Sequence, residues 1–279
     1  MSLEKVNAIL KEAEKNGYGV IGFICFNYES IAWVIETAEE ENTPVVVMFY
    51  AGMTKFMPAT TFAEITKDLA KRVKIPVGLL LDHCNSFELA MSFIKDGFTS
   101  VMIDGSTLDF EENVRLTAEV VRAAHAMGVD VEAELGHVGR ASNINDYMDI
   151  SNYTEPGKAA EFVERTKADA LAIAIGNAHG QYVAAPKLDL ELLDKINRAV
   201  DVPLVLHGGT GIPDDQLKKT VKLGISKMNV GTGVFQTFYS SIKEYVNCKD
   251  AKEDIFDAVA FQKKTVKEFL RGRIQALKP

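Results

Sequence analysis

Three of the five histidines in this 279-residue chain stand where strongly apolar segments end. His83 ends LLLDH, His179 follows LAIAIGNA, and His207 ends PLVLH. Segments of this kind are typical of β-strands that are buried on both faces. Three neutral imidazoles around one ion, with a fourth position open, are a common way of holding catalytic zinc. The spacing is too wide for a zinc finger, so the sequence predicts a zinc site that the fold assembles from distant segments.

Apolar segments alternate with helical patterns through almost the whole chain. The helical patterns, such as SFELAMSFIKDG and PDDQLKKTVKLG, begin near Ser, Asp or Pro and end at glycine, as helix termini prefer. Strands are expected at 19–26, 44–49, 77–82, 100–104, 129–135, 170–175, 203–207 and 226–230. This alternation predicts an α/β fold, a (β/α)8 TIM barrel. A doubly wound open sheet is the alternative, but it normally has a GxGxxG turn after its first strand, where this chain reads CFNYES.

No linker or shift in composition divides the chain, so residues 1–279 are expected to form a single domain. An N-terminal helix precedes the barrel, and a helical extension rich in Lys and Arg follows it from about residue 250. The 47% hydrophobic and 25% charged residues are typical of a soluble globular protein. The net charge of −8 argues against a nucleic-acid partner.

The N-terminus has no signal-peptide pattern, and no apolar segment reaches the roughly 20 residues of a membrane span, so a cytoplasmic location is expected. Cys25, Cys84 and Cys248 are far apart and are interpreted as reduced thiols. Cys84 neighbours His83, but adjacent side chains of a strand point to opposite sides, which argues against a fourth ligand at this position.

In a TIM barrel the carboxyl ends of the parallel strands meet at one face, where catalytic residues lie. Six consecutive predicted strands end in polar side chains, which are Asp82 and His83, Asp104, Glu132 and Glu134, Asn177 and His179, His207, and Asn229. Together they predict one site. His125, within a helical pattern, and His137, in the loop after the fifth strand, are expected to have structural roles.

Glycine-rich segments follow the last three predicted strands, at Gly180, at 208–211 (GGTG) and at 229–233 (NVGTG). Backbone N–H groups in such loops bind anions, and barrel enzymes often bind phosphate in the loops after their last strands. The sequence therefore predicts a phosphate site beside the metal site.

These motifs resemble those of the class II, metal-dependent fructose- and tagatose-bisphosphate aldolases. The resemblance runs from about residue 5 to 245. Its most specific pieces are LDH at 81–83, SVMIDGS at 100–106, VEAELG at 131–136, AIGNAHG at 174–180, LVLHGGTG at 204–211 and KMNVGT at 227–232.

The resemblance implies that His83, His179 and His207 hold Zn2+, and that Asp82 is the catalytic proton donor and acceptor. It also implies a second or alternative metal position at Asp104 and Glu134, and it allows for a monovalent cation. The residues that match the segments binding dihydroxyacetone phosphate are Gly180, Gly208, Gly209, Thr210, Asn229, Val230, Gly231 and Thr232.

The activity so implied is reversible aldol cleavage of a phosphorylated ketose, of the fructose or tagatose 1,6-bisphosphate type, to dihydroxyacetone phosphate and an aldehyde. The partner would be a small phosphorylated sugar rather than nucleic acid or a membrane, and the family suggests a homodimer or homotetramer. Cleavage of a different ketose 1-phosphate is the nearest alternative. A zinc-dependent hydrolase and a non-catalytic sugar-phosphate sensor are further alternatives.

Two positions depart from the family pattern. Relatives usually carry an acid in the loop after the fifth strand, where this chain reads GHVGRASNINDYMDISNYTEP; Asp146, Asp149, His137 and Tyr147 are candidate replacements. After the second strand, Tyr50 stands where the family often has serine. Both departures concern the part of the site that would hold the aldehyde.

Overall fold

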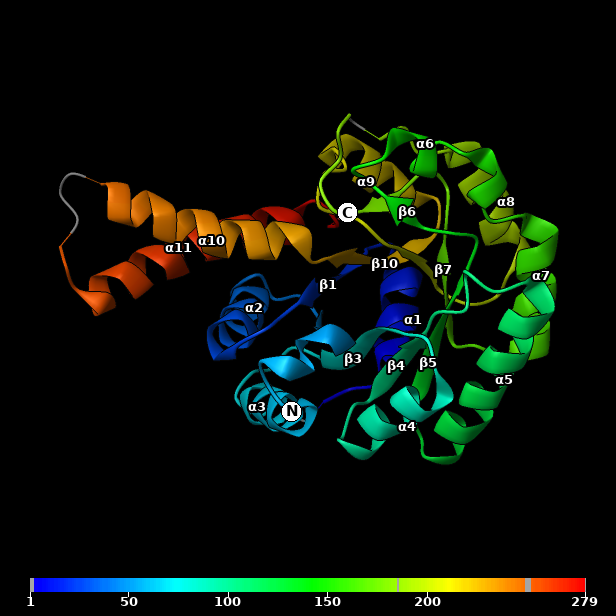
Figure 1. Ribbon diagram of the computed structural model, residues 1–279, viewed down its shortest axis with the longest axis horizontal. Coiled ribbons are helices and arrows are strands. Elements are labelled where there is room, and N and C mark those ends of the chain that lie inside the picture. The colour runs from blue at the N-terminus through cyan, green and yellow to red at the C-terminus, as the bar shows by residue number, and fades with distance from the viewer. Residues whose placement is uncertain (1–2, 185, 249–251, 279) are drawn as a thin grey trace.

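The computed structural model describes residues 3–184, 186–248 and 252–278, and a closed parallel barrel lies at its centre (Figure 1). The strands follow one another around the barrel in the order β1-β10-β9-β7-β5-β4-β3-β2. Their bounds are β1 Val20–Ile24, β2 Val45–Tyr50, β3 Val77–Cys84, β4 Ser100–Ile103, β5 Asp130–Leu135, β7 Ala170–Ile173, β9 Leu204–Leu206 and β10 Ile225–Val230. The TIM barrel predicted from the sequence is therefore confirmed, with a barrel strand in every predicted segment.

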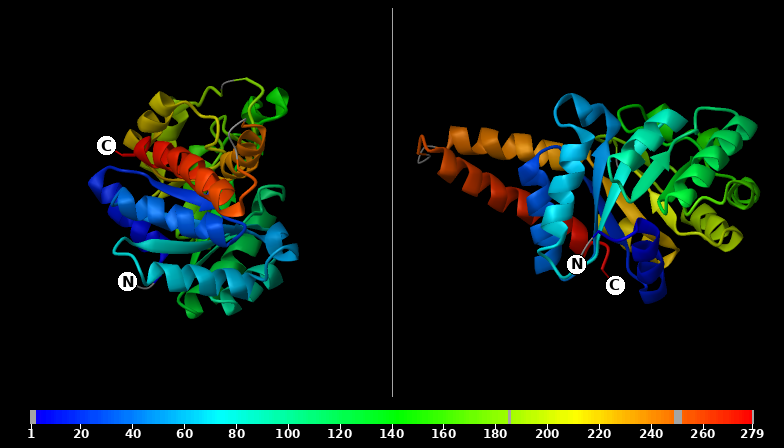
Figure 2. Two further views of the ribbon diagram at one scale, coloured as in Figure 1. Left: turned by 90° about the vertical axis from the view of Figure 1, so that its left-hand side faces the viewer. Right: turned by 90° about the horizontal axis from the view of Figure 1, so that it is seen from below.

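Helices connect the strands and cover the outside of the barrel (Figures 1 and 2). Their bounds are α1 Val6–Asn16, α2 Tyr28–Glu40, α3 Ala59–Ala70, α4 Phe87–Lys95, α5 Phe110–Ala126, α7 Pro156–Thr166, α8 Leu190–Ala199, α9 Asp214–Lys222, α10 Thr232–Asn247 and α11 Ile255–Gln275. Side chains cap several of them: Ser86 accepts a hydrogen bond from Leu89 N, and Asp109 accepts one from Glu112 N. No helix among the described residues combines the length and apolar character needed to cross a membrane.

The barrel strands contribute to two separate hydrophobic clusters, which explains why they are apolar on both faces. A large cluster fills the space between the strands and the surrounding helices. A smaller cluster lies inside the barrel, where Val46, Leu80 and Met102 pack on Ile9 and Leu10 of α1. Because α1 and this apolar layer fill one end of the barrel, polar side chains are left to the other end.

Short elements in the loops were not predicted from the sequence. They are η1 Ala51–Lys55, β6 Gly139–Arg140, α6 Ile144–Tyr147, η2 Ile150–Asn152 and β8 Ala178–His179. β6 and β8 pair in parallel, with Arg140 opposite His179. Strands of two residues carry too little periodicity to be detected in a sequence.

The C-terminal segment was predicted as an extension beyond the barrel. The structure shows that its first part projects from the barrel, whereas its last part packs against it. α10 and α11 run side by side and project from the barrel as a two-helix arm (Figure 2). The second half of α11 returns to the barrel, where Leu270 and Ile274 are buried and Arg271 binds the carboxylates of Glu40 and Glu41. Its Lys and Arg residues thus fasten α11 to the acidic end of α2.

Replacing Leu270 with alanine tests whether α11 belongs to the core. Since Leu270 is fully buried, the variant should lose about 2–5 kcal/mol of unfolding free energy in denaturant titrations. Glu268→Ala, at an exposed position in the same part of the helix, is the matched control and should change stability by less than about 0.5 kcal/mol. Equal effects would contradict this description of α11.

Candidate metal centre and active site

The three strand-end histidines occupy different positions relative to the barrel strands. His83 lies in β3, and His207 directly follows β9. The sequence predicted that His179 follows a strand over 170–175, but β7 ends at Ile173 and His179 lies on the short strand β8. The chain thus leaves the barrel wall after Ile173, before it reaches His179. The pairing of β8 with β6 fixes the position of His179 outside the barrel strands.

His83 is directed into the barrel by a local irregularity of β3. The register between β3 and β4 shifts between Leu81 and Cys84, and His83 has a φ of 46°. Non-glycine residues rarely adopt this left-handed conformation, and bulges of this kind redirect side chains beside functional sites. Cys84 points away from the centre, with its Sγ 3.0 Å from the carbonyl oxygen of Met102.

The three imidazoles converge on one point. His83 Nε2 lies 3.0 Å from His179 Nε2 and 3.0 Å from His207 Nδ1. His179 Nε2 and His207 Nδ1 are 3.3 Å apart. Ligands about 2.0–2.1 Å from a tetrahedral zinc ion are themselves about 3.3 Å apart. The spacing of the three nitrogens therefore suits a single metal ion of this kind.

The other nitrogen of each ring has its own acceptor. His83 Nδ1 lies 2.8 Å from Asp104 Oδ2, His179 Nδ1 lies 3.3 Å from the Val138 carbonyl oxygen, and His207 Nε2 lies 2.9 Å from Glu132 Oε1. Such partners fix the tautomer and the ring orientation of metal-binding histidines. All three lone pairs are thereby directed at the same centre.

Two of the three rings are neutral before a metal ion binds, and the third is protonated. Burial, together with the neighbouring histidines, lowers the pKa of His179 and of His207, so both are neutral ligands in neutral solution. Burial also opposes the charge on His83, but Asp82, Asp104 and Glu134 outweigh it and raise its pKa to about 10. His83 must therefore release a proton when a metal ion binds.

Asp104 and Glu134 form a second candidate metal group with His83. Glu134 Oε1 accepts a hydrogen bond from Val138 N, while the buried Oε2 has no hydrogen-bond partner among the described residues. Burial and the neighbouring Asp104 raise the pKa of Glu134 to about 8. A buried carboxylate oxygen without a partner, 3.7 Å from His207 Nδ1, fits a cation in its vicinity.

Asp82 lies beside the histidines in the wall of a cavity of about 480 Å³. Its side chain is largely buried, and Oδ1 accepts a hydrogen bond from Asn229 Nδ2 at 3.1 Å. Oδ2 makes no hydrogen bond within the described part of the chain. The structure thus brings one carboxylate to the cavity with one oxygen held and the other available.

The glycine-rich loops form the adjoining part of this cavity. Its lining there comprises Gly180, Gly208, Thr210, Asn229, Gly231 and Thr232. At Gly208, with a φ of 72°, a Cβ would lie 1.9 Å from the Ala178 carbonyl oxygen, so only glycine fits. α10 begins at Thr232 beside this part of the cavity, and the N–H of Gly233 in its first turn donates to Thr210 Oγ1 at 3.0 Å.

Two residues predicted for substrate binding do not line the cavity. The N–H of Gly209 donates to the carbonyl oxygen of Asn229 at 2.9 Å, and Val230 is buried in β10. Asn177 also lies apart, because its amide donates to the carbonyl oxygens of Ile173 and His207 and so braces the loop backbone.

Of the four candidates in the loop after β5, only His137 lines the cavity. Asp146 accepts a hydrogen bond from Arg140 N, and Asp149 caps η2 through Ser151 N. Tyr147 is buried against Tyr182. His125, predicted to be structural, lies 2.8 Å from Asp169 Oδ2, outside the site.

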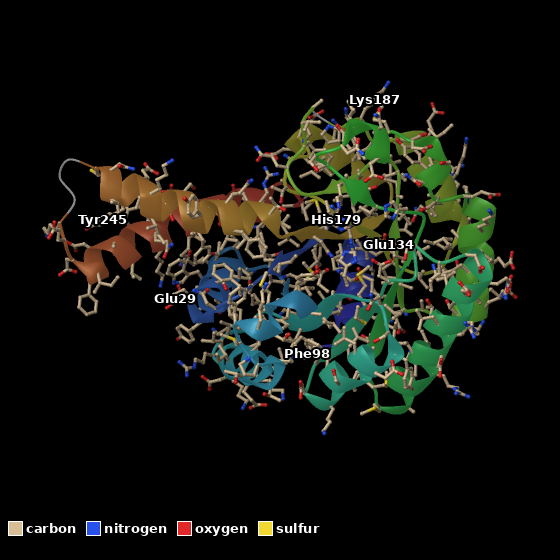
Figure 3. All side chains as sticks on the ribbon, viewed as in Figure 1. Glu29, Phe98, Glu134, His179, Lys187 and Tyr245 are labelled. Carbon is tan, nitrogen blue, oxygen red and sulfur yellow. The ribbon has the colours of Figure 1, made fainter. Side chains whose placement is uncertain are left out.

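Several lining residues were missed from the sequence, namely Ile24, Ser106, Thr107, Arg140 and Phe235. Most lie in loops or at the start of a helix, where no periodicity marks which side chain faces inward. Tyr50, expected near the aldehyde, lies in the lining and pairs with Asp82 across β2 and β3. Figure 3 shows His179 and Glu134 within the barrel, far from Tyr245 on the arm.

The structure combines a TIM barrel with three converging histidines and an adjoining cavity lined by glycine-rich loops. The chain matches the sequence profile of the family "Fructose-bisphosphate aldolase class-II" over residues 4–278. It is 41% identical to a fructose-bisphosphate aldolase of Geobacillus stearothermophilus over 251 residues, which cover 88% of this chain and 86% of that protein. It therefore belongs to the class II fructose-bisphosphate aldolase family.

The sequence and the structure of one further relative agree with this assignment, and a second structure shares the fold. The chain is 40% identical over 233 residues to YdjI of Escherichia coli K12, a protein described as uncharacterized, covering 84% of each chain. The crystal structure of the YdjI aldolase superposes with a TM-score of 0.88 over 99% of this chain and 97% of that one. A fructose-bisphosphate aldolase structure from Campylobacter jejuni, at 24% identity and a TM-score of 0.82 over 99% of this chain and 95% of that one, shares the fold.

Removal of one imidazole tests the centre directly. His83→Ala should weaken zinc binding by more than about 100-fold, since loss of outer partners alone weakens metal sites by ~10–100-fold. Metal content after dialysis against a graded zinc buffer measures the change. His125→Ala, on the outside of the barrel, is the matched control and should bind zinc like the unaltered protein. Retained zinc in His83→Ala would contradict the assignment.

Proposed function

We propose that this chain catalyses zinc-dependent, reversible aldol cleavage of a phosphorylated ketose to dihydroxyacetone phosphate and an aldehyde. The observation that carries the proposal is the convergence of three anchored imidazoles beside Asp82, in one cavity with the glycine-rich loops. Family membership supports an aldolase; the metal and the substrate class are inferred from the site.

The hydrogen-bond donors and the histidines of the cavity would bind different parts of the substrate. Gly180, Gly208, Thr210 and the first turn of α10 offer neutral N–H and hydroxyl donors, which suit a phosphate at one end of the ketose. Zinc held by the three histidines would act as a Lewis acid on the ketone and hydroxyl oxygens, stabilising the charge that develops as the C3–C4 bond breaks. No lysine is needed as an electron sink.

Asp82 is assigned the proton transfer. Asn229 binds Oδ1, so Oδ2 accepts the proton of the C4 hydroxyl as the carbon–carbon bond breaks, and returns it in the reverse reaction. The enediolate left on the triose then takes up a proton at C3 from solvent to give dihydroxyacetone phosphate. The aldehyde would then lie toward Tyr50, Ser106, Thr107 and His137, on the side away from the phosphate loops. Fructose 1,6-bisphosphate, tagatose 1,6-bisphosphate and another ketose 1-phosphate are the substrates to compare.

An assay of triose phosphate release tests the proposal. Purified protein should release dihydroxyacetone phosphate from at least one of these ketoses, lose the activity on chelation, and regain it with zinc. Activity that survives complete removal of metal would refute the metal-dependent reaction. Release of inorganic phosphate in place of triose phosphate would indicate a hydrolase.

Asp82→Asn separates proton transfer from metal binding. The amide keeps the shape of the side chain but cannot accept the hydroxyl proton, so kcat should fall by about 10²–10⁴-fold. Zinc content should match that of the unaltered protein. Loss of zinc in parallel with activity would mean that Asp82 serves the metal instead.

We also infer that the chain forms a homo-oligomer through the α10–α11 arm. Tyr239, Val246 and Phe256 of the arm are 74%, 72% and 81% exposed, more apolar surface than a projecting element of a monomer usually presents. Val246→Glu should reduce the mass measured by light scattering, whereas Ile150→Glu, at a 78% exposed position away from the arm, should not. A monomeric unaltered protein would refute this inference.

A further inference from the structure

One fully buried lysine lies next to the site without entering the mechanism proposed above. Lys227 stands on β10, has no exposed surface, and is not in the cavity lining. Its side chain points into the barrel, two residues before Asn229 on the same side of the strand. A buried ammonium group requires partners, because an uncompensated charge in the interior is strongly destabilising.

Lys227 has two partners, and both connect it to the site. Its Nζ lies 2.7 Å from Glu132 Oε2 and donates to Asn229 Oδ1 at 2.9 Å. Glu132 Oε1 in turn lies 2.9 Å from His207 Nε2, while Asn229 Nδ2 donates to Asp82 Oδ1 and also lies 3.1 Å from His207 Nε2. One ammonium group therefore holds both the carboxylate beside His207 and the amide that contacts Asp82.

The second branch depends on which way the Asn229 amide faces. An amide has an acceptor end and a donor end, and an ammonium group has only donors. Lys227 therefore selects the orientation in which Oδ1 faces the lysine and the NH2 group faces Asp82. The reversed amide would direct its oxygen at the carboxylate of Asp82 and its NH2 group at the ammonium, which is unfavourable at both ends.

We propose that Lys227 is a positioning residue of the aldol cleavage: it orients the Asn229 amide so that this amide holds Asp82 for proton transfer. The inference rests on the function proposed above, and it extends that function to a residue outside the cavity. Gly22 lies opposite Asn229 in β1, and a Cβ there would lie 2.7 Å from Met48 Sδ and 3.3 Å from Asn229 Oδ1, so this glycine leaves room for both side chains.

A purely structural role for Lys227 makes a different prediction. In that case the lysine would only neutralise Glu132, whose burial disfavours its charge while Lys227 and His207 lower its pKa to about 2. Removing the charge of Glu132 as well would then restore both stability and activity. If Lys227 positions Asn229, the same second substitution restores stability alone.

The experiment compares Lys227→Met with the charge-balanced double variant Lys227→Met/Glu132→Gln. For each protein, the melting temperature, the zinc content and kcat per bound zinc are measured with the best phosphorylated ketose. We expect both variants to lose about 10–100-fold in kcat per bound zinc, because small displacements of a catalytic group cost rates of this size. The double variant should melt at a higher temperature than the single one. Since its charges balance, it also serves as the test if Lys227→Met does not fold.

Lys267→Met is the matched control, because Lys267 is also ion-paired and largely covered, but on α11 against Glu40. It should lower the melting temperature without changing kcat. Recovery of kcat in the double variant, kcat within twofold in Lys227→Met, or zinc loss that accounts for the whole effect would each overturn the inference while the proposed function stands. An unaltered protein that cleaves no phosphorylated ketose would overturn both.

Discussion

The site depends on holding three imidazole nitrogens within 3.0–3.3 Å of one another, although they come from segments far apart in the chain. Nitrogen lone pairs at this distance repel one another unless a cation or a proton lies between them. Barrel closure brings the segments together, and Asp104, Glu132 and the Val138 carbonyl oxygen keep each ring from turning away. The left-handed backbone at His83 is a local strain that this arrangement maintains.

The interior of the barrel is divided along its axis. Apolar side chains and α1 fill one end, and the ionisable residues Asp82, Glu132, Glu134 and Lys227 occupy the other. Period-two alternation places Glu132 and Glu134 on the same side of β5, and Lys227 and Asn229 on the same side of β10. The strands thus carry a layer of charge that is held by ion pairs and hydrogen bonds rather than by solvent.

The barrel could be predicted because eight apolar segments repeat at regular intervals, and the convergence of the three histidines could be predicted because they follow those segments closely. The alternation of Lys227 with Asn229 was visible too, but a lysine in a strand gives no sign of which partners it meets. The detour through β8, the bulge at His83 and the inward-facing Arg140 could not be predicted, because each depends on contacts between distant loops. The structural roles of Asp146 and Asp149 could not be predicted either, because an aspartate that caps a turn looks the same in a sequence as a catalytic aspartate.

The pairing of β6 with β8 has a mechanical consequence for the long loop after β5. Arg140 lies opposite His179, Ala141 N donates to the His179 carbonyl oxygen, and Val138 O binds the ring of His179. The first part of this loop therefore holds the candidate metal ligand His179 and cannot move without breaking these contacts. A hinge for any loop movement that leaves the metal centre intact has to lie beyond Ala141, so only the following residues are available to close over a bound substrate.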